Sequence, residues 1–209
     1  MDNLQEQLDY ALRLVAWSWI ARESGVQVEL IDVLLDAGAS VDGNTVYEGR
    51  YGTHSDAAIY NRNFAAAEHL VRRGARLTLS TAVNLARWSD AERLLEAATL
   101  GDKQDAFVQA AMNGKAEALR RMLASGMDAT TVSARNQSHG TALHHAVWSG
   151  SLSAVRALVE GGADLSRRDT IYDGTPLEWA QHAERDNAED GRKQQYREIA
   201  GFLAAQGGA

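Results

Sequence analysis

The chain has 209 residues, of which 45% are hydrophobic and 23% are charged, and its formal net charge is −7. This composition is that of a folded globular protein, and the excess of acidic residues argues against nucleic acid or an anionic membrane surface as a partner. The chain has no cysteine, which excludes disulfides, thiolate nucleophiles and cysteine metal ligands.

No segment predicts export or membrane insertion. The first residues lack a basic region, and the apolar stretch over residues 11–20 is interrupted by Arg13 and Ser18. No window approaches the roughly 18 to 20 apolar residues that a membrane-spanning helix needs. We therefore expect no signal peptide, no transmembrane helix and a cytoplasmic location.

The N-terminal region predicts two helices, over residues 8–22 and 27–37. The second helix ends on the phrase Leu34-Leu35-Asp36-Ala37-Gly38-Ala39, in which a glycine just past the last apolar turn can adopt the left-handed conformation that closes a helix. The phrase recurs with its glycine at Gly74, Gly126 and Gly162. Apolar residues at helical spacing precede each copy, so the predicted unit is helix, tight turn, helix and loop.

The spacing of these glycines predicts a repeat. Gly38 and Gly74 lie 36 residues apart, as do Gly126 and Gly162. This is close to the period of about 33 residues of one two-helix repeat family. The 52 residues from Gly74 to Gly126 leave room for one abbreviated repeat, and residues 85–95 would supply both of its helices, followed by a shortened loop.

The pattern changes at the C-terminal end of the chain. A first helix continues past Ala183, a charged insertion covers residues 184–193, and a last helix covers residues 196–205. The end units of a solenoid must cover the last apolar face with a partly polar one, so we interpret the atypical first and last units as caps. The acidic insertion is interpreted as solvated, because it lacks the spacing of a calcium loop.

Two segments carry a family signature. The segments Gly140-Thr141-Ala142-Leu143-His144-His145-Ala146 and Gly174-Thr175-Pro176-Leu177-Glu178-Trp179-Ala180 resemble the ankyrin signature Gly-x-Thr-Pro-Leu-His-x-Ala. Gly162-Ala163-Asp164 resembles the motif that follows the second helix of an ankyrin repeat. The resemblance implies an all-α ankyrin-repeat solenoid of stacked antiparallel helix pairs, forming a single domain over residues 1–209. Its approximate repeats cover residues 4–42, 43–78, 79–102, 103–138, 139–172 and 173–209, the third being abbreviated.

The histidines are the first candidates for chemistry. Adjacent residues on a helix point about 100° apart, so His144 and His145 cannot hold one metal ion together. The resemblance implies that His144 is structural and hydrogen-bonds the loops of adjoining repeats. No nucleotide-binding, nucleophile or zinc motif occurs in the sequence. We therefore predict no catalytic residue, no metal site, no cofactor and no enzymatic activity.

A column of large side chains is the stronger candidate site. Aligning one small residue of each first helix selects Ala58, Ala86, Ala110, Ala146 and Ala180. Two residues further on stand the members of the column, Tyr60, Trp88, Met112, Trp148 and His182. The resemblance implies that this column lies on the concave side, where ankyrin repeats commonly touch partners, and Trp and Tyr are typical of binding hot spots. The alternative is that these rings pack over one another as core.

The loops between repeats supply a second set of candidates. Tyr47, Arg50 and Tyr51 lie in one unusually long loop, and Tyr172 lies in another. Tyrosine with glycine and arginine in an exposed loop suits recognition, although such a tyrosine could instead support the neighbouring loop. Trp17 and Trp19 face different sides of the first helix, and we expect one of them in the core.

These patterns predict a monomeric protein-interaction module that binds another protein through its concave groove and loops. One alternative is a small-ligand or enzymatic pocket in the concave face near His145, Trp148, Trp179 and His182. Another alternative is self-association through the column of large side chains.

Overall fold

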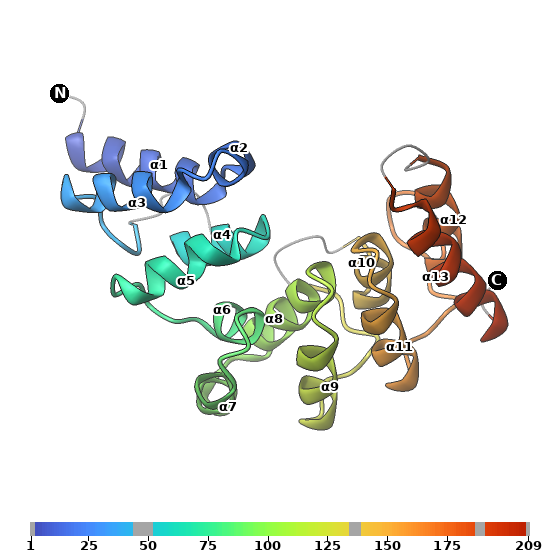
Figure 1. Cartoon of the computed structure of the whole chain (residues 1–209). Helices are drawn as coiled ribbons and strands as arrows, with labels where there is room; N and C mark the ends of the chain where they lie inside the picture. Colours follow the sequence, from blue (N-terminus) through green and yellow to red (C-terminus); the bar gives the residue numbers. More distant parts are fainter. Residues whose placement is uncertain (1–2, 44–51, 134–138, 187–190, 208–209) are drawn as a thin grey trace. The chain divides into compact units, whose positions relative to one another are not determined.

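The computed structural model describes residues 3–43, 52–133, 139–186 and 191–207. Within these ranges the regular secondary structure is helical, apart from one isolated bridge between Val132 and Thr141. The predicted all-α class is confirmed. The chain divides into two compact units, Met1–Ala97 and Ala98–Ala209, which are described separately below (Figure 1). The single domain over residues 1–209 and the repeat boundaries stay predictions.

The described residues form three helix pairs in each unit. The pairs of unit 1 are built from α1 (Leu4–Trp17) with α2 (Trp19–Glu23) and α3 (Gln27–Asp36), α4 (His54–Tyr60) with α5 (Phe64–Arg72), and α6 (Leu79–Asn84) with α7 (Trp88–Ala97). The pairs of unit 2 are α8 (Leu100–Met112) with α9 (Ala116–Ala124), α10 (Ala142–Trp148) with α11 (Leu152–Glu160), and α12 (Pro176–Asp186) with α13 (Lys193–Ala205).

The glycine that ends four of the second helices works as predicted. Gly74 has φ +99°, and its N–H donates to the carbonyl oxygen of Val71 at 3.1 Å. The following N–H, of Ala75, donates to the carbonyl oxygen of Leu70 at 2.9 Å. Gly38, Gly126 and Gly162 close their helices with the same pair of hydrogen bonds. These bonds satisfy the last carbonyl groups of the helix, which otherwise have no partner.

A second left-handed residue follows the first helix of the first five repeats. Glycine fills this position at Gly25, Gly114 and Gly150, whereas Arg62 (φ +60°) and Ala86 (φ +58°) fill it in the second and third repeats. A side chain with a Cβ costs about 1 kcal/mol in this conformation. The second and third repeats therefore carry local strain at this turn, which glycine avoids in the first, fourth and fifth repeats.

We predict that Ala86→Gly raises the free energy of unfolding by about 0.5–1 kcal/mol, because glycine adopts this conformation without strain. Urea-induced unfolding followed by circular dichroism measures the change. The matched control is Ala65→Gly inside α5, where the same substitution lowers the free energy of unfolding by about 0.5–1 kcal/mol. The strain argument fails if both variants are destabilised alike.

The prediction of one continuous helix over residues 8–22 is wrong, because this helix is interrupted. It breaks at Ser18, whose backbone is extended and whose hydroxyl accepts the N–H of Ala21 to begin α2. Two buried amide side chains donate hydrogen bonds to backbone carbonyl groups that the break leaves without a helical partner. Gln27 Nε2 donates to Val15 O at 2.9 Å, and Asn63 Nδ2 donates to Ala16 O at 2.8 Å.

The expectation that one tryptophan of this helix lies in the core is also wrong. Trp17 is 41% exposed and Trp19 is 64% exposed. The break at Ser18 shifts Trp19 into a new helix, α2, so the helical spacing assumed for the pair does not hold.

The third repeat is abbreviated as predicted, but its helices begin earlier. The first helix is α6, which precedes residues 85–95, and those residues hold the turn and most of α7. Only Ala98 and Thr99 lie between α7 and α8. At the other end of the chain, α12 continues past Ala183 as predicted, and residues 187–190 of the charged insertion lie outside the described part.

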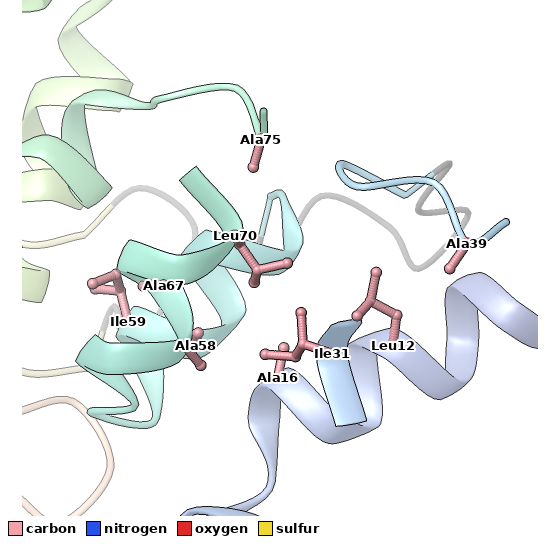
Figure 2. Close-up of a cluster of buried hydrophobic side chains, with 10 residues drawn as sticks. Leu12, Ala16, Ile31, Ala39, Ala58, Ile59, Ala67, Leu70 and Ala75 are labelled. Atoms are coloured by element: carbon pink, nitrogen blue, oxygen red, sulfur yellow. The ribbon is translucent and has the colours of Figure 1, made fainter. Parts of the chain in front are cut away.

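Small side chains and branched apolar ones share the core of unit 1. Figure 2 shows Leu12 and Ala16 of α1 beside Ile31 of α3, with Ala58 of α4 and Leu70 of α5 belonging to the same cluster. All five are fully buried. The alanines let neighbouring helix backbones approach closely, and each buried leucine or isoleucine contributes about 1.5–3 kcal/mol by leaving water.

His54 is a buried titratable group next to this core. It opens α4 and is 1% exposed. Its pKa is lowered to about 4, chiefly by burial and then by the charge of Arg13, while Asp9 and Asp42 oppose the shift. In the unfolded chain the pKa of histidine is about 6.5. Between these values the unfolded chain binds a proton that the folded chain does not, so acid favours unfolding.

We predict that His54 by itself lowers the free energy of unfolding by up to about 3 kcal/mol as the pH drops from 6.5 to 4. Below pH 4 we expect the contribution of His54 to stay constant. In His54→Gln this contribution disappears, so its stability varies less across the same interval. Urea unfolding at a series of pH values, with the parent chain as the reference, measures the difference. Parallel pH profiles of the two proteins would contradict the prediction.

Candidate partner-binding surface

Trp179 of α12 is the centre of a group of rings in unit 2. Its ring centroid lies 5.1 Å from that of His144, 5.8 Å from that of His139 and 6.2 Å from that of His145. Trp148 of α10 meets it edge to face at 6.2 Å, and Tyr172 of the preceding loop does so at 6.5 Å. We call these six residues the aromatic cluster. Edge-to-face pairs of this kind are favourable beyond the area that they bury.

Asp169 fixes the loop that carries Tyr172. One carboxylate oxygen accepts the N–H groups of Ile171 and Tyr172 at 2.9 and 2.7 Å. The other accepts the N–H of Gly174 and the indole N–H of Trp179, both at 2.9 Å. A single buried carboxylate therefore ties the turn of residues 169–174 to the central ring of the aromatic cluster.

The hydrogen bonds of Asp169 also set its charge state. Burial acts to raise the pKa of this carboxyl, but the four donors outweigh burial and lower the pKa to about 2. The group is therefore a carboxylate at neutral pH. Charge-assisted hydrogen bonds of this kind are stronger than those between neutral groups, which favours a rigid loop.

His144 has a structural role, as the sequence resemblance implies. It is fully buried, and its Nδ1 accepts the backbone N–H of Thr141 at 3.2 Å. Because Nδ1 is an acceptor, Nε2 carries the proton and donates to the carbonyl oxygen of Gly174, 3.0 Å away in the next repeat. Burial lowers the pKa of His144, so the ring is neutral at physiological pH.

Part of the aromatic cluster is open to solvent. Trp148 is 53% exposed, Tyr172 is 74% exposed, and the neighbouring Ile171 is 63% exposed. We call these three residues the exposed aromatic surface. Trp179 lies half-buried between Trp148 and Tyr172 and contacts both rings. The structure thus brings together Trp148 from the predicted column and Tyr172 from the predicted loop set.

The remaining members of the column in unit 2 occupy equivalent places. Met112 ends α8 as Trp148 ends α10, and these two helices pack against each other. Met112 is half-buried. His182 has the equivalent register in α12, where its exposed ring pairs with Asp186 at 3.0 Å. The alternative prediction was a ligand pocket near His145, Trp148, Trp179 and His182. The ring of Trp179 contacts the rings of His145 and Trp148, so three of these four residues lie together.

Trp88 does not belong to the column, and this part of the prediction is wrong. The small residue of the third repeat is the buried Ala82, whose carbonyl accepts the N–H of Arg87 just as that of Ala58 accepts the N–H of Asn63. Ala86 is instead the exposed, left-handed turn residue. Trp88 consequently begins α7 rather than ending the first helix.

The other predicted contacts lie elsewhere. Tyr60 ends α4 in unit 1 and is half-buried. Tyr47, Arg50 and Tyr51 lie outside the described residues. Sequence reasoning missed Asp169 and did not place Trp179 at the centre of the rings. The available signal was the spacing, because an aspartate five residues before a glycine can accept the N–H groups of the intervening turn.

Comparison with known proteins identifies the family. A family model described as Ankyrin repeats (3 copies) matches residues 57–169, more than half of the chain. The chain belongs to the ankyrin-repeat family. This confirms the predicted resemblance and the solenoid fold class, and ankyrin repeats are generally protein–protein interaction modules.

The other comparisons add less. A crystal structure of the human ASB11 ankyrin repeat domain is similar at 20% sequence identity and a TM-score of 0.46, over 83% of this chain and 78% of that chain. No curated protein matches the ankyrin-repeat chain. Among the described helices none is long and apolar enough to cross a membrane. In the same residues no three histidine, aspartate or glutamate side chains form a group that could hold a metal ion.

We predict that Asp169→Asn lowers the free energy of unfolding by about 2–3 kcal/mol. The N–H of Gly174 and the indole N–H of Trp179 now donate to one carboxylate oxygen, and in the variant the amide NH₂ group, itself a donor, would take the place of one carboxylate oxygen. Urea unfolding at pH 7 measures the loss. Asp173→Asn is the matched control, since that carboxylate is exposed and its left-handed backbone suits asparagine. Equal effects at the two positions would show that the carboxylate of Asp169 does not hold the loop.

Proposed function

We propose that this ankyrin-repeat protein binds another protein through the exposed aromatic surface of unit 2. The observation that carries the proposal is the junction at Trp179, where an exposed ring from a first helix and an exposed ring from a loop rest on one half-buried ring. Trp148 and Tyr172 offer a large contact area with few rotatable bonds. Binding hot spots are typically formed by such rings.

The hydrogen bonds below the surface support the same proposal. Asp169 holds the backbone of the loop, and His144 donates to the carbonyl of Gly174 at the other end of that loop. A loop that is already fixed loses little conformational entropy when a partner binds. A protein segment with apolar or aromatic side chains suits the exposed rings, and we propose this as the partner chemistry.

The remaining predicted contacts extend the proposal. Met112 and His182 flank Trp148 in the equivalent register of α8 and α12, and we propose them as neighbouring contacts. Tyr60 and Trp88 belong to unit 1 and are proposed as separate contacts, each requiring its own variant. Tyr47, Arg50 and Tyr51 stay proposals from the sequence.

We propose a binding role rather than catalysis. The two nitrogens of His144 are committed to Thr141 and Gly174, so this histidine is not available as a general base. Trp179 packs edge to face against His144 and Trp148, which favours a contact surface over a site for a small substrate.

The test is affinity capture with the double variant Trp148→Ala, Tyr172→Ala. Both side chains are more than half exposed, so we expect the variant to keep the helical content and thermal stability of the parent. We expect proteins captured by the parent to be depleted at least tenfold in the variant's catch, which corresponds to the loss of about 1.4 kcal/mol or more of binding free energy.

Two further variants make the result specific. Leu100→Ala removes an exposed apolar side chain of α8 outside the exposed aromatic surface, and we expect it to retain every captured protein. Trp88→Ala tests the separate contact in unit 1. An unchanged catch with Trp148→Ala, Tyr172→Ala, together with a loss in Trp88→Ala, would move the binding site to unit 1 and overturn the proposal.

A further inference from the structure

Asp169 is a buried charge that is held by neutral groups alone. It is 3% exposed, and its four hydrogen bonds come from three backbone N–H groups and the indole N–H of Trp179. In the part of the chain that the structure describes, no lysine or arginine forms an ion pair with this carboxylate. Buried charges are usually paired with an opposite charge. The negative charge of Asp169 therefore acts on its surroundings, where water screens it little.

Trp179 lies between this charge and the exposed rings. Its indole N–H donates to the carboxylate of Asp169 at 2.9 Å. Such a hydrogen bond polarises the group that donates it, and an anion at the N–H makes the indole ring more negative. The face of an indole ring already attracts cations more strongly than that of any other aromatic side chain. Trp179 is therefore well suited to hold a positive charge.

The two exposed rings leave room for such a charge. The planes of Trp148 and Tyr172 are inclined to that of Trp179 by 78° and 68°, so neither ring is stacked flat on it. Both exposed rings are more than half open to solvent. A cation is attracted to a ring when it lies within about 6 Å of the ring centroid. With centroids 6.2 and 6.5 Å from that of Trp179, one cation can satisfy this distance for two rings at once.

The segment that carries the loop has an excess of negative charge. Residues 164–178 contain four carboxylates and two arginines, a formal net charge of −2. The guanidinium of Arg168 pairs with Glu178 at 3.2 Å and lies 3.8 Å from a carboxylate oxygen of Asp173, so these two carboxylates share one cation. Asp173 follows Tyr172 directly, and its side chain is 85% exposed. Complementary charge in a partner would thus be positive.

We propose that the exposed aromatic surface binds a lysine or arginine side chain of the partner protein, held against the rings of Trp148, Trp179 and Tyr172. This inference rests on the proposed function and adds the charge of the partner to it. The long apolar stem of either side chain packs on exposed rings, while its charged end stays near the carboxylates. An acidic segment would be repelled, and a purely apolar one would leave the charge of Asp169 without a countercharge.

The test is a titration of the full chain followed by the indole N–H resonances of Trp148 and Trp179 in nuclear magnetic resonance spectra. The probes are n-butylammonium, which reproduces the lysine side chain, N-propylguanidinium, which reproduces that of arginine, and the neutral 1-butanol. We expect saturable shifts of both resonances, with at least one cation binding about fivefold or more tightly than 1-butanol. This preference should shrink as sodium chloride is added.

Matched variants locate the effect. Trp148→Leu keeps an apolar side chain but removes the ring, and we expect it to lose the preference for the cation while still binding 1-butanol; Trp148→Phe should keep part of the preference. Asp173→Asn should weaken cation binding about twofold without changing that of 1-butanol. The control Glu117→Gln removes a carboxylate of α9, and we expect no effect. Circular dichroism checks that each variant is folded.

Equal affinities for the cations and 1-butanol, or a preference for cations that survives in Trp148→Leu, would overturn the inference. Affinity capture with Trp148→Ala, Tyr172→Ala separates this failure from that of the proposed function. A depleted catch together with equal probe affinities would keep the protein-binding surface and refute its cationic ligand. A preference for cations together with an unchanged catch would refute the protein-binding function, and with it the partner's side chain as the ligand.

Discussion

The structure depends on the mutual burial of helices that are too short to persist alone. The described helices have between 5 and 14 residues, and isolated helices below about 12–15 residues are marginal in water. Each is stable because a neighbouring helix covers its apolar face. Alanines such as Ala16, Ala58 and Ala146 sit fully buried at these contacts and allow the close approach.

Buried polar side chains form hydrogen bonds with the backbone N–H and carbonyl groups that the ends of the short helices leave without partners. Every helix end leaves carbonyl or N–H groups without an internal partner, and repeats with frequent turns have many such ends. Gln27 and Asn63 supply donors at the break between α1 and α2. Asp169 supplies acceptors in the loop before α12, and His144 bridges two repeats. These groups determine where the turns lie, and the turns determine which rings reach solvent.

The exposed aromatic surface lies beyond the core. Its rings are held by one half-buried tryptophan and one carboxylate. A surface fixed in this way is what we propose for the local recognition of a protein segment.

The sequence by itself determined the repeat, the all-α class and the ends of the second helices, because these follow from local chemistry. A glycine after an apolar turn, as at Gly74, closes a helix wherever it occurs. The sequence also selected Trp148 and Tyr172, since their residue type and place in the repeat are local features. It misplaced Trp88, because the abbreviated third repeat has no glycine at its turn and Ala86 was mistaken for the small helix residue.

Only the tertiary structure decided which of these residues work together. Trp179 joins Trp148 and Tyr172 because α10, the loop and α12 converge, and no periodicity along the chain encodes that distance. The exposure of both Trp17 and Trp19 likewise depends on a helix break that distant side chains, Gln27 and Asn63, stabilise. Local patterns specify the helices and turns, whereas contacts between residues far apart in the chain specify which faces are covered and which stay open.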